Sequence, residues 1–397
     1  MRLEDYIKII GEETVAQIHA AAQPLREQSV LHINATYHGG GVAEMLRTIV
    51  PLMNEMGLDA DWSLLYGEPE LFRTTKKIHN GIQGEKVELT QEELTTYFSI
   101  NKTFARYTPI FHDTVIVHDP QPLPMLQYRK KSRPWIWRCH IDSSAPNKEV
   151  WETLKPLIAR YDAMIVSSES FKRPELSIPT YIIPPAIDPF SLINQDLSPD
   201  DVAGKLAEYD IPQDKPLIVQ VSRFDKWKDP LGVIEVFRRV RKETDCRLVM
   251  LGNMASDDPE GPQIYAEVAA QAGKLDGVQL ITQSDPLLVN ALQRSAAVVV
   301  QLSRKEGFGL TVSEALWKST PVVATRVGGI PLQIEDGRTG FLTDYADYGT
   351  IAERVLRVLN DPELSDRLGR EGKEHVRKNF LMPRLLLDWL KVLAQVR

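Results

Sequence analysis

The strongest constraint on the fold is a repeated alternation of short apolar runs with stretches of helical spacing. Continuous, β-branched runs are typical of strands in a parallel sheet that is covered on both faces. Between the runs, segments such as 41–56 and 147–160 carry apolar residues at helical spacing. The pattern predicts a doubly wound α/β domain. The runs that predict strands in the first half of the chain are 29–34, 114–118, 135–140 and 163–168.

The same alternation starts again in the second half. Residues 184–201 carry Pro and Asp without sustained periodicity, and predict a connection that ends in a helix cap near Ser198. Two such blocks predict an α/β fold of two Rossmann-like domains that face each other across a cleft. The runs that predict strands in the second block are 216–222, 247–252, 278–282, 297–302 and 321–325.

The expected domain limits follow from these blocks. Residues 1–195 form the first domain and residues 196–375 the second. The end of the chain has an almost wholly helical pattern, and Pro383 suits the first turn of the last helix. We expect the helix within 376–397 to pack back on the first domain.

Composition excludes several classes of function. The chain has 47 Lys and Arg against 54 Asp and Glu, a formal net charge of −7. An acidic balance argues against a dedicated nucleic-acid binder, which needs a basic face. No apolar run is long enough to cross a membrane, and the first residues lack the apolar region of a signal peptide. Cys139 and Cys246 have no metal-ligand neighbours, which favours buried thiols in a reducing, cytoplasmic compartment.

Ligands of open α/β sheets bind outside the carboxyl ends of the strands, so the loops that follow strands are the places to search. The first such loop is His38-Gly39-Gly40-Gly41, after run 29–34 and before a helix. Consecutive glycines let the backbone approach a ligand, and the helix N-terminus behind them offers free N–H groups. The loop is neither a P-loop nor a GxGxxG motif, and the alternative is a glycine-rich tight turn.

A second loop carries two cations directly after a strand. Arg223 and Lys228 follow run 216–222. A planar guanidinium and a compact ammonium together can neutralise a diphosphate. The alternative is a solvated charged loop in which Asp225 pairs with Lys226.

A third loop, 304–314, leaves run 297–302 through glycines and enters a helix at about Leu310. Small residues before a helix N-terminus form an anion site. Glu306 in the loop and Glu314, expected in the first helical turn, are good acceptors for sugar hydroxyls. For Glu314 the alternative is a glutamate that complements the helix dipole, which does not account for Glu306.

Two histidines also follow strands at the expected ligand-facing end. His118, with Asp119, follows run 114–118, and His140 ends run 135–140. We expect His118 and Asp119 on the side of a site that holds the acceptor of a transferred group. The alternative is that the histidines are satisfied core or surface residues.

Together these motifs resemble the retaining GT-B glycosyltransferases, the class of glycogen and sucrose synthases. The resemblance rests on Glu306-Gly-Phe-Gly-Leu with Glu314 eight positions later, on Arg223 with Lys228, on the glycine loop, and on Gly328-Gly329 after Pro321-Val-Val-Ala. It covers residues 29 to about 345. Within the class, the chain is most similar to the nucleotide-sugar-dependent trehalose synthases. The strings that carry this similarity begin at His38, Val117, Trp137, Asp257 and Arg377.

The resemblance implies roles for these residues. Arg223 and Lys228 would hold the donor diphosphate, Glu306 the donor glucose and Glu314 the ribose hydroxyls. His140 would lie near the sugar, and Arg223, Lys228, Glu306 and His140 form the implied catalytic set. The backbone around the third loop would contact phosphate or sugar, Gly40 and Gly41 would lie against the donor, and Gln283 would read the base. The residues implied in that third loop are Gly307, Phe308, Gly309, Leu310 and Thr311.

Two positions depart from the pattern of the class. Many members have Glu where this chain has Leu332, so a role of that carboxylate is absent here. Many also have Gly where this chain has Ser319, a position that usually serves packing.

The implied reaction moves glucose from a nucleotide diphosphate glucose, such as UDP-glucose or ADP-glucose, onto glucose, reversibly and with retention, to form trehalose. No tightly bound cofactor and no protein metal site are expected, and Mg²⁺ would at most stimulate by binding the nucleotide. The expected partners are the small substrates, with no nucleic acid and no membrane, and the resemblance implies a homodimer. Alternatives are a nucleotide-sugar 2-epimerase, a non-catalytic sensor, or transfer to a glucan or a sugar phosphate held by Arg129, Lys130 and Lys131.

Overall fold

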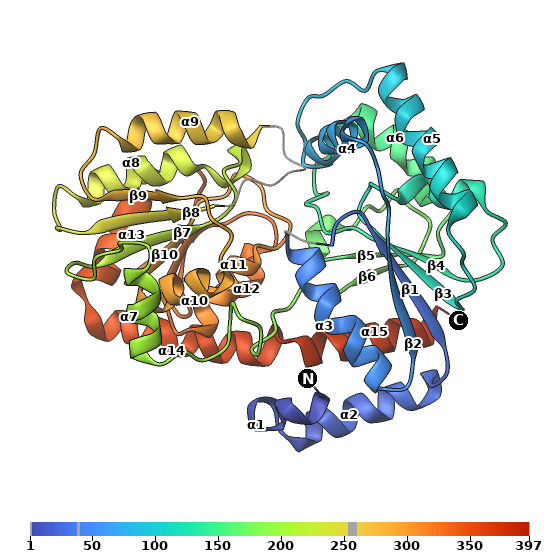
Figure 1. Cartoon of the computed structure of the whole chain (residues 1–397), viewed down its shortest axis with the longest axis horizontal. Coiled ribbons are helices and arrows are strands. Elements are labelled where there is room, and N and C mark those ends of the chain that lie inside the picture. Colours follow the sequence, from blue (N-terminus) through green and yellow to red (C-terminus); the bar gives the residue numbers. More distant parts are fainter. Residues whose placement is uncertain (1, 38–39, 253–259, 397) are drawn as a thin grey trace. The chain divides into compact units, whose positions relative to one another are not determined.

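The structure is a computed structural model that describes residues 2–37, 40–252 and 260–396. The chain divides into two compact units (Figure 1). Unit 1 comprises Met1–Ala186 and Met382–Arg397, and unit 2 comprises Ile187–Leu381. The two domain limits expected from the sequence, after residues 195 and 375, both fall within unit 2.

Unit 1 contains a six-stranded sheet in the order β2-β1-β3-β4-β5-β6, with every neighbouring pair parallel. The strand order reverses between β1 and β3, so the loops after these two strands diverge to opposite faces of the sheet. Such a reversal is where open α/β sheets bind ligands. The strands are β1 (Ser29–Asn34), β2 (Asp59–Leu64), β3 (Thr114–His118), β4 (Trp135–Arg138), β5 (Ala163–Val166) and β6 (Thr180–Ile182).

Helices bury both faces of this sheet. Alternate residues of β1 show the two faces: Val30 belongs to a core shared with α2, α3 and α15, whereas Leu31 belongs to a core shared with α4, α5 and α6. The C-terminal helix α15 packs against α2 and α3, and Figure 1 shows it in red beside α3. The helices are α2 (Glu12–Ala22), α3 (Gly41–Glu55), α4 (Pro69–Ile82), α5 (Gln91–Tyr107), α6 (Lys148–Ile158) and α15 (Met382–Gln395), with shorter turns α1 (Ile7–Ile10), η1 (Leu3–Tyr6), η2 (Gln23–Leu25), η3 (Leu123–Tyr128) and η4 (Glu169–Phe171).

Unit 2 repeats the architecture with the strand order β12-β11-β10-β7-β8-β9, again parallel throughout. Here the order reverses between β7 and β10. The strands are β7 (Leu217–Val221), β8 (Arg247–Leu251), β9 (Val278–Ile281), β10 (Val298–Gln301), β11 (Val322–Thr325) and β12 (Phe341–Thr343). The helices are α7 (Pro199–Ala207), η5 (Lys226–Lys228), α8 (Pro230–Val240), α9 (Gly261–Ala272), α10 (Pro286–Ser295), α11 (Leu310–Trp317), α12 (Ile330–Gln333), α13 (Tyr348–Asn360) and α14 (Pro362–Asn379).

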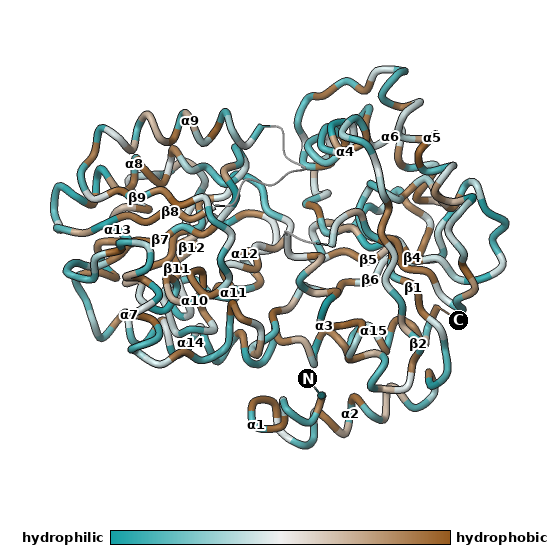
Figure 2. The backbone as a smooth tube through the Cα atoms, in the orientation of Figure 1, coloured by the Kyte–Doolittle hydropathy of each residue, from teal (hydrophilic) through white to brown (hydrophobic). Residues whose placement is uncertain are grey.

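The predicted α/β class with two doubly wound parallel sheets is confirmed. Each of the nine predicted strands is present, and Figure 2 shows their hydrophobic residues as brown stretches inside the units. The predicted cap is also confirmed, because the Ser198 hydroxyl accepts the N–H of Asp201 at the start of α7. The strands predicted over 135–140 and 163–168 are shorter than predicted, since β4 ends at Arg138 and β5 ends at Val166.

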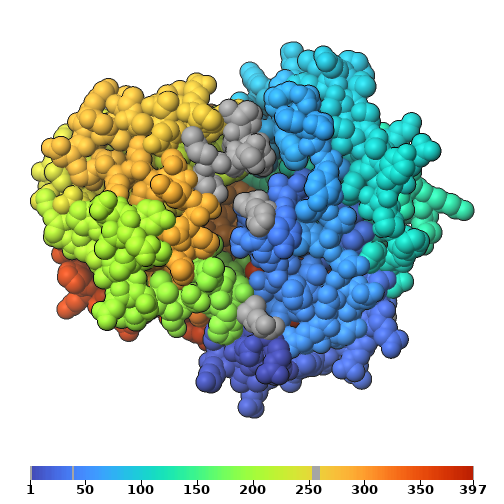
Figure 3. All heavy atoms as spheres, viewed as in Figure 1, coloured from blue at the N-terminus to red at the C-terminus, as the bar shows by residue number. Residues whose placement is uncertain are grey.

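Strands β2, β6 and β12 were missed. They lie at the edges of their sheets, and β2 alternates exposed Asp with partly buried residues instead of forming a continuous apolar run. Figure 3 shows the same view with all heavy atoms as spheres, coloured along the sequence. Among the residues that the structure describes, no helix combines the length and the hydropathy that a membrane crossing requires.

Candidate active-site residues

The predicted cationic loop and the predicted acidic loop of unit 2 leave neighbouring strands. Arg223 and Lys228 follow β7, and Glu306 follows β10. Because β7 and β10 are adjacent and parallel, both loops emerge at the carboxyl edge of the sheet, at the point where the strand order reverses. The backbone N–H of Arg304 donates to the carbonyl of Trp227 (2.8 Å), which ties the two loops together.

Lys228 and Glu306 form an ion pair across this strand reversal. The Lys228 ammonium donates to Oε2 of Glu306, and both side chains are largely buried, with exposed fractions of 18% and 10%. The same carboxylate oxygen accepts the hydroxyl of Ser303 (3.0 Å). Gln220 on β7 donates to the carbonyl of Lys228 (3.1 Å), which fixes the backbone beneath the ammonium. A buried pair held in this way is preorganised, since neither side chain is free to swing into solvent.

Arg223 lies beside a second carboxylate, that of Asp225. Its Nη2 lies 3.7 Å from Oδ2 of Asp225, and 36% of its side chain is exposed. Asp225 is itself buried, and its Oδ1 accepts the N–H of Trp227 (2.9 Å) at the start of η5. The ammonium of Lys226, the other cation considered for Asp225, lies 3.3 Å from the carboxylate of Glu260.

The glycines of the acidic loop make close backbone packing possible. Gly309 adopts a left-handed conformation (φ +82°) immediately before α11, a conformation that side chains disfavour. A Cβ on Gly328 would lie 1.6 Å from the carbonyl oxygen of Glu306. The Gly328-Gly329 pair thus lets the loop after β11 rest directly on the loop that carries Glu306. The side chain of Phe308, in the same acidic loop, is buried and packs edge-on against Phe380, with ring centroids 5.4 Å apart.

Helix α11 begins at Leu310, as predicted, but the predicted place of Glu314 is wrong. Glu314 is the fifth residue of α11 and so lies in the second turn, and no acidic residue stands in the first. Complementing the helix dipole is therefore a weak explanation for this carboxylate, since that effect falls off within the first turn. Thr311, by contrast, is the second residue of α11, where N–H groups have no partner inside the helix.

Lys318, which the sequence did not single out, lies buried one turn after Glu314. Its ammonium donates to the side-chain oxygen of Asn194 (2.8 Å) and to the carbonyl of Glu314 (3.0 Å). The pKa of Lys318 is lowered to about 7, mainly by burial and in part by the nearby Arg294, against the opposing effect of Glu314. Nothing in the local pattern distinguishes this lysine from a surface one, because its burial depends on the segment around Asn194.

A pH dependence of stability follows from Lys318. Its folded-state pKa is lowered from 10.5, so the unfolded chain binds more protons than the folded chain between about pH 7 and pH 10.5. The contribution of Lys318 to the free energy of unfolding therefore rises with pH across that window. We expect the unfolding free energy of wild type to rise relative to that of Lys318→Met between pH 7 and pH 10. Denaturant titrations at several pH values measure the difference. The exposed Lys274→Met is the control, and parallel curves for wild type and Lys318→Met would contradict the assignment.

The remaining predicted donor residues lie in loops at carboxyl ends. Gln283 is exposed in the loop between β9 and α10. In unit 1, Gly40 has φ +100° and directly precedes α3, whose first residue is Gly41. An added Cβ at Gly40 would meet nothing within 4 Å, so the conformation, not packing, requires glycine there. His38, Gly39 and Asp257 lie outside the described residues.

In unit 1 the structure brings together three histidines from adjacent strands. His32 Nδ1 lies 3.0 Å from His118 Nε2, and His118 Nδ1 lies 3.0 Å from His140 Nε2. The rings stack, with centroids 5.3 Å apart in both pairs. His32 and His118 are buried, whereas His140 is partly exposed. Both ring nitrogens of His118 are thus engaged by histidines, so the predicted acceptor-side role of His118 stays a prediction.

His32 was missed because it lies inside an apolar strand. A signal was nevertheless present. Val30, Ile116 and Ile136 lie on the face of the sheet covered by α3 and α15, and in each of these three neighbouring strands the residue two positions later, on the same face, is polar. The indole of Trp389 on α15 packs edge-on against His32, with centroids 5.7 Å apart.

Asp119 ties the end of β3 to the end of β4. Its Oδ1 accepts the N–H of His140 (2.7 Å), and its carbonyl accepts the indole N–H of Trp137 (3.0 Å). Burial raises the pKa of Asp119 to about 6, against the opposing effects of the His140 N–H and of Arg138. The Arg138 guanidinium is itself buried, donates to the carbonyl of Ile183 (2.7 Å), and leaves its Nη1 without a partner.

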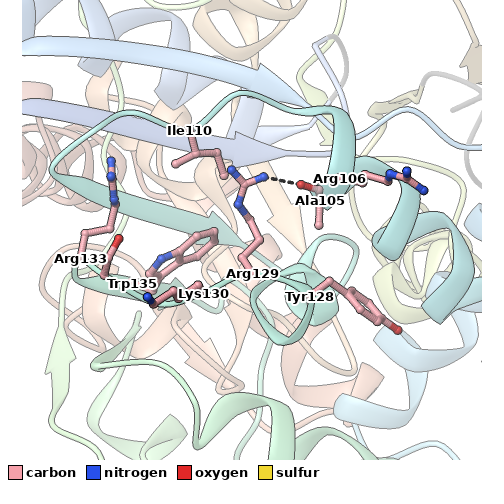
Figure 4. A pocket seen from close by; sticks show the side chains of 9 residues that line it. Ala105, Arg106, Ile110, Tyr128, Arg129, Lys130, Arg133 and Trp135 are labelled. Carbon is pink, nitrogen blue, oxygen red and sulfur yellow. Dashed lines mark hydrogen bonds between the residues drawn. The ribbon is translucent and has the colours of Figure 1, made fainter.

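A pocket of about 400 Å³ lies in unit 1 near the amino ends of the sheet strands, away from the histidines (Figure 4). It is lined by Arg129, Lys130 and Arg133 and by Trp135, the first residue of β4. The guanidinium of Arg129 points to the carbonyl of Ala105, where it caps the end of α5. These cations therefore lie at the amino edge, one strand length (roughly 15 Å) from the loops after β3 and β4. A sugar phosphate bound at the carboxyl edge would not reach them.

Among the described residues, no group of three or more His, Cys, Asp or Glu side chains is arranged to hold a metal ion. Cys139 and Cys246 are buried free thiols, and they belong to different units. Burial raises the pKa of Cys246 to about 11, so this thiol is not a reactive thiolate at neutral pH.

Two family models match the chain. The trehalose synthase N-terminal domain matches residues 32–173, and glycosyl transferases group 1 matches residues 204–375. A protein named trehalose synthase from Rubrobacter xylanophilus is 44% identical, over 99% of this chain and 97% of that protein. Another trehalose synthase, from Pyrococcus horikoshii, is 41% identical, over 99% of this chain and 96% of that protein.

The fold is similar to that of solved structures with little sequence identity. One example is an E. coli structure described as trehalose-6-phosphate bound with UDP-2-fluoro glucose. It has a TM-score of 0.77 at 15% identity, and the match covers 93% of this chain and 100% of that one. Identity this low shows the shared GT-B fold and nothing finer.

Proposed function

Because the chain belongs to the trehalose synthase family of group 1 glycosyltransferases, we propose that it transfers glucose from a nucleotide diphosphate glucose to glucose. The transfer is reversible, retains the anomeric configuration and gives trehalose. The observation that supports this best is the buried Lys228–Glu306 pair at the strand reversal of unit 2, which offers a cation for a diphosphate beside a carboxylate for sugar hydroxyls.

The cations act on the leaving group. Breaking the anomeric C–O bond leaves negative charge on the diphosphate, and Lys228 and Arg223 stabilise that charge. An ammonium has several N–H donors, so Lys228 can keep its bond to Glu306 while it donates to a phosphate oxygen. The backbone N–H groups from Phe308 to Thr311, just before and at the start of α11, supply further donors.

The carboxylates act on hydroxyls. Glu306 binds hydroxyls of the donor glucose, and Ser303 keeps its carboxylate oriented. Glu314, in the second turn of α11, binds the ribose hydroxyls. Gln283 follows β9, which lies two strands from β7, a lateral distance of roughly 10 Å that suits contact with the base of the same nucleotide.

Unit 1 contributes the rest of the proposed site. Gly40 and Gly41 approach the donor through their backbone, and His140 contacts the transferred sugar. Asp119 holds the backbone of His140 in place and lies on the acceptor side. Exclusion of water during transfer is required, because hydrolysis of the donor is the competing reaction.

The proposed chemistry needs no protein nucleophile. We assign none of the proposed site carboxylates as a glycosidase-like nucleophile, because Glu306 is paired with Lys228, Glu314 lies in the second turn of α11 and Asp119 accepts the N–H of His140. We therefore propose a front-face displacement in which the acceptor oxygen bonds to the anomeric carbon, the C–O bond to phosphate breaks, and the leaving phosphate takes the acceptor proton. Mg²⁺ acts only on the nucleotide, and the protein is a homodimer.

The test is an acceptor screen. Purified protein is mixed with UDP-, ADP- or GDP-glucose and free glucose, and the products are resolved by chromatography and NMR. We expect a disaccharide with both anomeric carbons linked α, formed fastest from one of the three donors. Donor consumed without a disaccharide would overturn the proposal in favour of hydrolysis, epimerisation or another acceptor. Donor binding without turnover on any acceptor would favour a sensor.

A further inference from the structure

The three stacked histidines of unit 1 form a chain of ring contacts that ends at His140. We propose that His32 and His118 are positioning residues that hold His140 as the Nδ1–H tautomer, so that it presents an N–H donor at the carboxyl edge of the sheet. The chain of rings starts in the middle of β1, passes the end of β3 and ends at His140 after β4. The contact of this N–H group with a sugar oxygen rests on the proposed function, but the tautomer of His140 does not.

The rings are neutral at physiological pH. His32 and His118 are buried, and burial lowers the pKa of His32 to about 3. The pKa values of His118 and His140 also lie well below the ordinary value, through burial and through the nearby guanidinium of Arg138. A neutral imidazole has one N–H, and the hydrogen bond made by one nitrogen decides the state of the other.

Neutral rings joined in this order have two self-consistent arrangements. Each contact joins an Nδ1 to the Nε2 of the next ring and must contain one proton. If His118 carries its proton on Nδ1, it donates to His140 and accepts from His32, so all three rings are Nδ1–H. If it carries the proton on Nε2, all three rings are Nε2–H. The state of the innermost ring therefore fixes the state of the outermost one.

The buried end selects between them. Nε2 of His32 is fully buried and has no hydrogen-bond partner. In the Nε2–H arrangement this atom would be a buried donor without an acceptor, and orphaned buried N–H groups are rarer than under-satisfied acceptors. The neighbouring ring of Trp389 offers at most a weak N–H···π contact. The Nδ1–H arrangement leaves only a bare lone pair there and is favoured.

This selection defines what His140 can recognise. Its free nitrogen, Nδ1, donates a hydrogen bond, and it could accept one only if all three rings changed tautomer together. A hydroxyl oxygen or an oxygen that gains negative charge during transfer is thus a matched partner. Asp119 fixes the backbone of the same residue, so both the position and the polarity of the ring are set from within unit 1.

The first test observes the tautomers directly. The full-length protein is labelled with ¹⁵N-histidine, and long-range ¹H–¹⁵N correlation spectra distinguish Nδ1–H from Nε2–H rings. The chain has 8 histidines, and single substitutions assign the signals of His32, His118 and His140. We expect all three as Nδ1–H in wild type without substrate. His140 as Nε2–H, or as a mixture of forms, would overturn the inference.

The second test compares two substitutions at one position. His118→Asn keeps an amide donor where His118 Nδ1 stood, whereas His118→Leu removes it. We expect His140 to stay Nδ1–H in His118→Asn and to show both forms in His118→Leu. In the transfer assay, kcat should fall by about tenfold or more in His118→Leu, with a small change in KM, and recover in His118→Asn. Equal kcat in the two variants, both folded by circular dichroism, would mean that His118 is only a packing residue.

The two proposals fail separately. If the acceptor screen yields no disaccharide, the spectra still decide the tautomer of His140. If the spectra show the Nε2–H arrangement while trehalose forms normally, the positioning role is overturned and the proposed function stands.

Discussion

Lys228→Ala is expected to lower the rate of glucosyl transfer by about a hundredfold or more, because one contact to the leaving group contributes roughly 3 kcal/mol to the barrier. The loss should appear mainly in kcat, since the charge on the diphosphate grows as the bond to the sugar breaks. Steady-state rates with the preferred donor and glucose measure it. Near-normal turnover would remove Lys228 from the proposed site.

Lys226→Ala is the matched control. Lys226 lies on the same short helix, η5, and also forms an ion pair, with Glu260, but its side chain is 35% exposed against 18% for Lys228. Surface pairs of this kind contribute little to stability. We expect Lys226→Ala to retain wild-type turnover, so that a loss in Lys228→Ala alone reports the chemistry and not the removal of a lysine from this helix.

Glu306→Gln is expected to lower transfer by about a hundredfold as well, because it replaces a charged acceptor of sugar hydroxyls with a neutral amide of the same shape. The amide can still accept the hydroxyl of Ser303, so unit 2 should remain folded. Kinetics with a common donor, with thermal unfolding alongside, measure the effect. Glu260→Gln is the control, and equal turnover in the two variants would contradict the assignment.

The double variant separates two explanations for these losses. Lys228 and Glu306 contact each other, so either residue could matter only because it holds the other. In that case Lys228→Ala combined with Glu306→Gln should be no slower than the slower single variant. If both residues bind substrate, the double variant should be slower than either, and the coupling energy from the cycle measures how much they share.

Several parts of the fold could be predicted because they depend on local patterns. The buried strands are continuous apolar runs, and the start of α7 is marked by Ser198 three residues before Asp201, whose side chains exchange hydrogen bonds with the backbone. The edge strand β2 could not be found in this way. Its alternating exposed residues gain their stability from pairing with β1, which is a contact between distant segments.

For the candidate site, too, local patterns predicted one part and contacts between distant segments decided the other. The glycines, Arg223, Lys228, Glu306 and His140 were singled out because they follow strands, and parallel strands bring their carboxyl ends to one edge. The sequence thus predicted which loops carry the chemistry and determined which family the chain belongs to. Only the tertiary structure decided which of these side chains meet. The pairing of Lys228 with Glu306, and the joining of His32 to His140 through His118, depend on strand order, and strand order is set by packing between segments far apart in the chain.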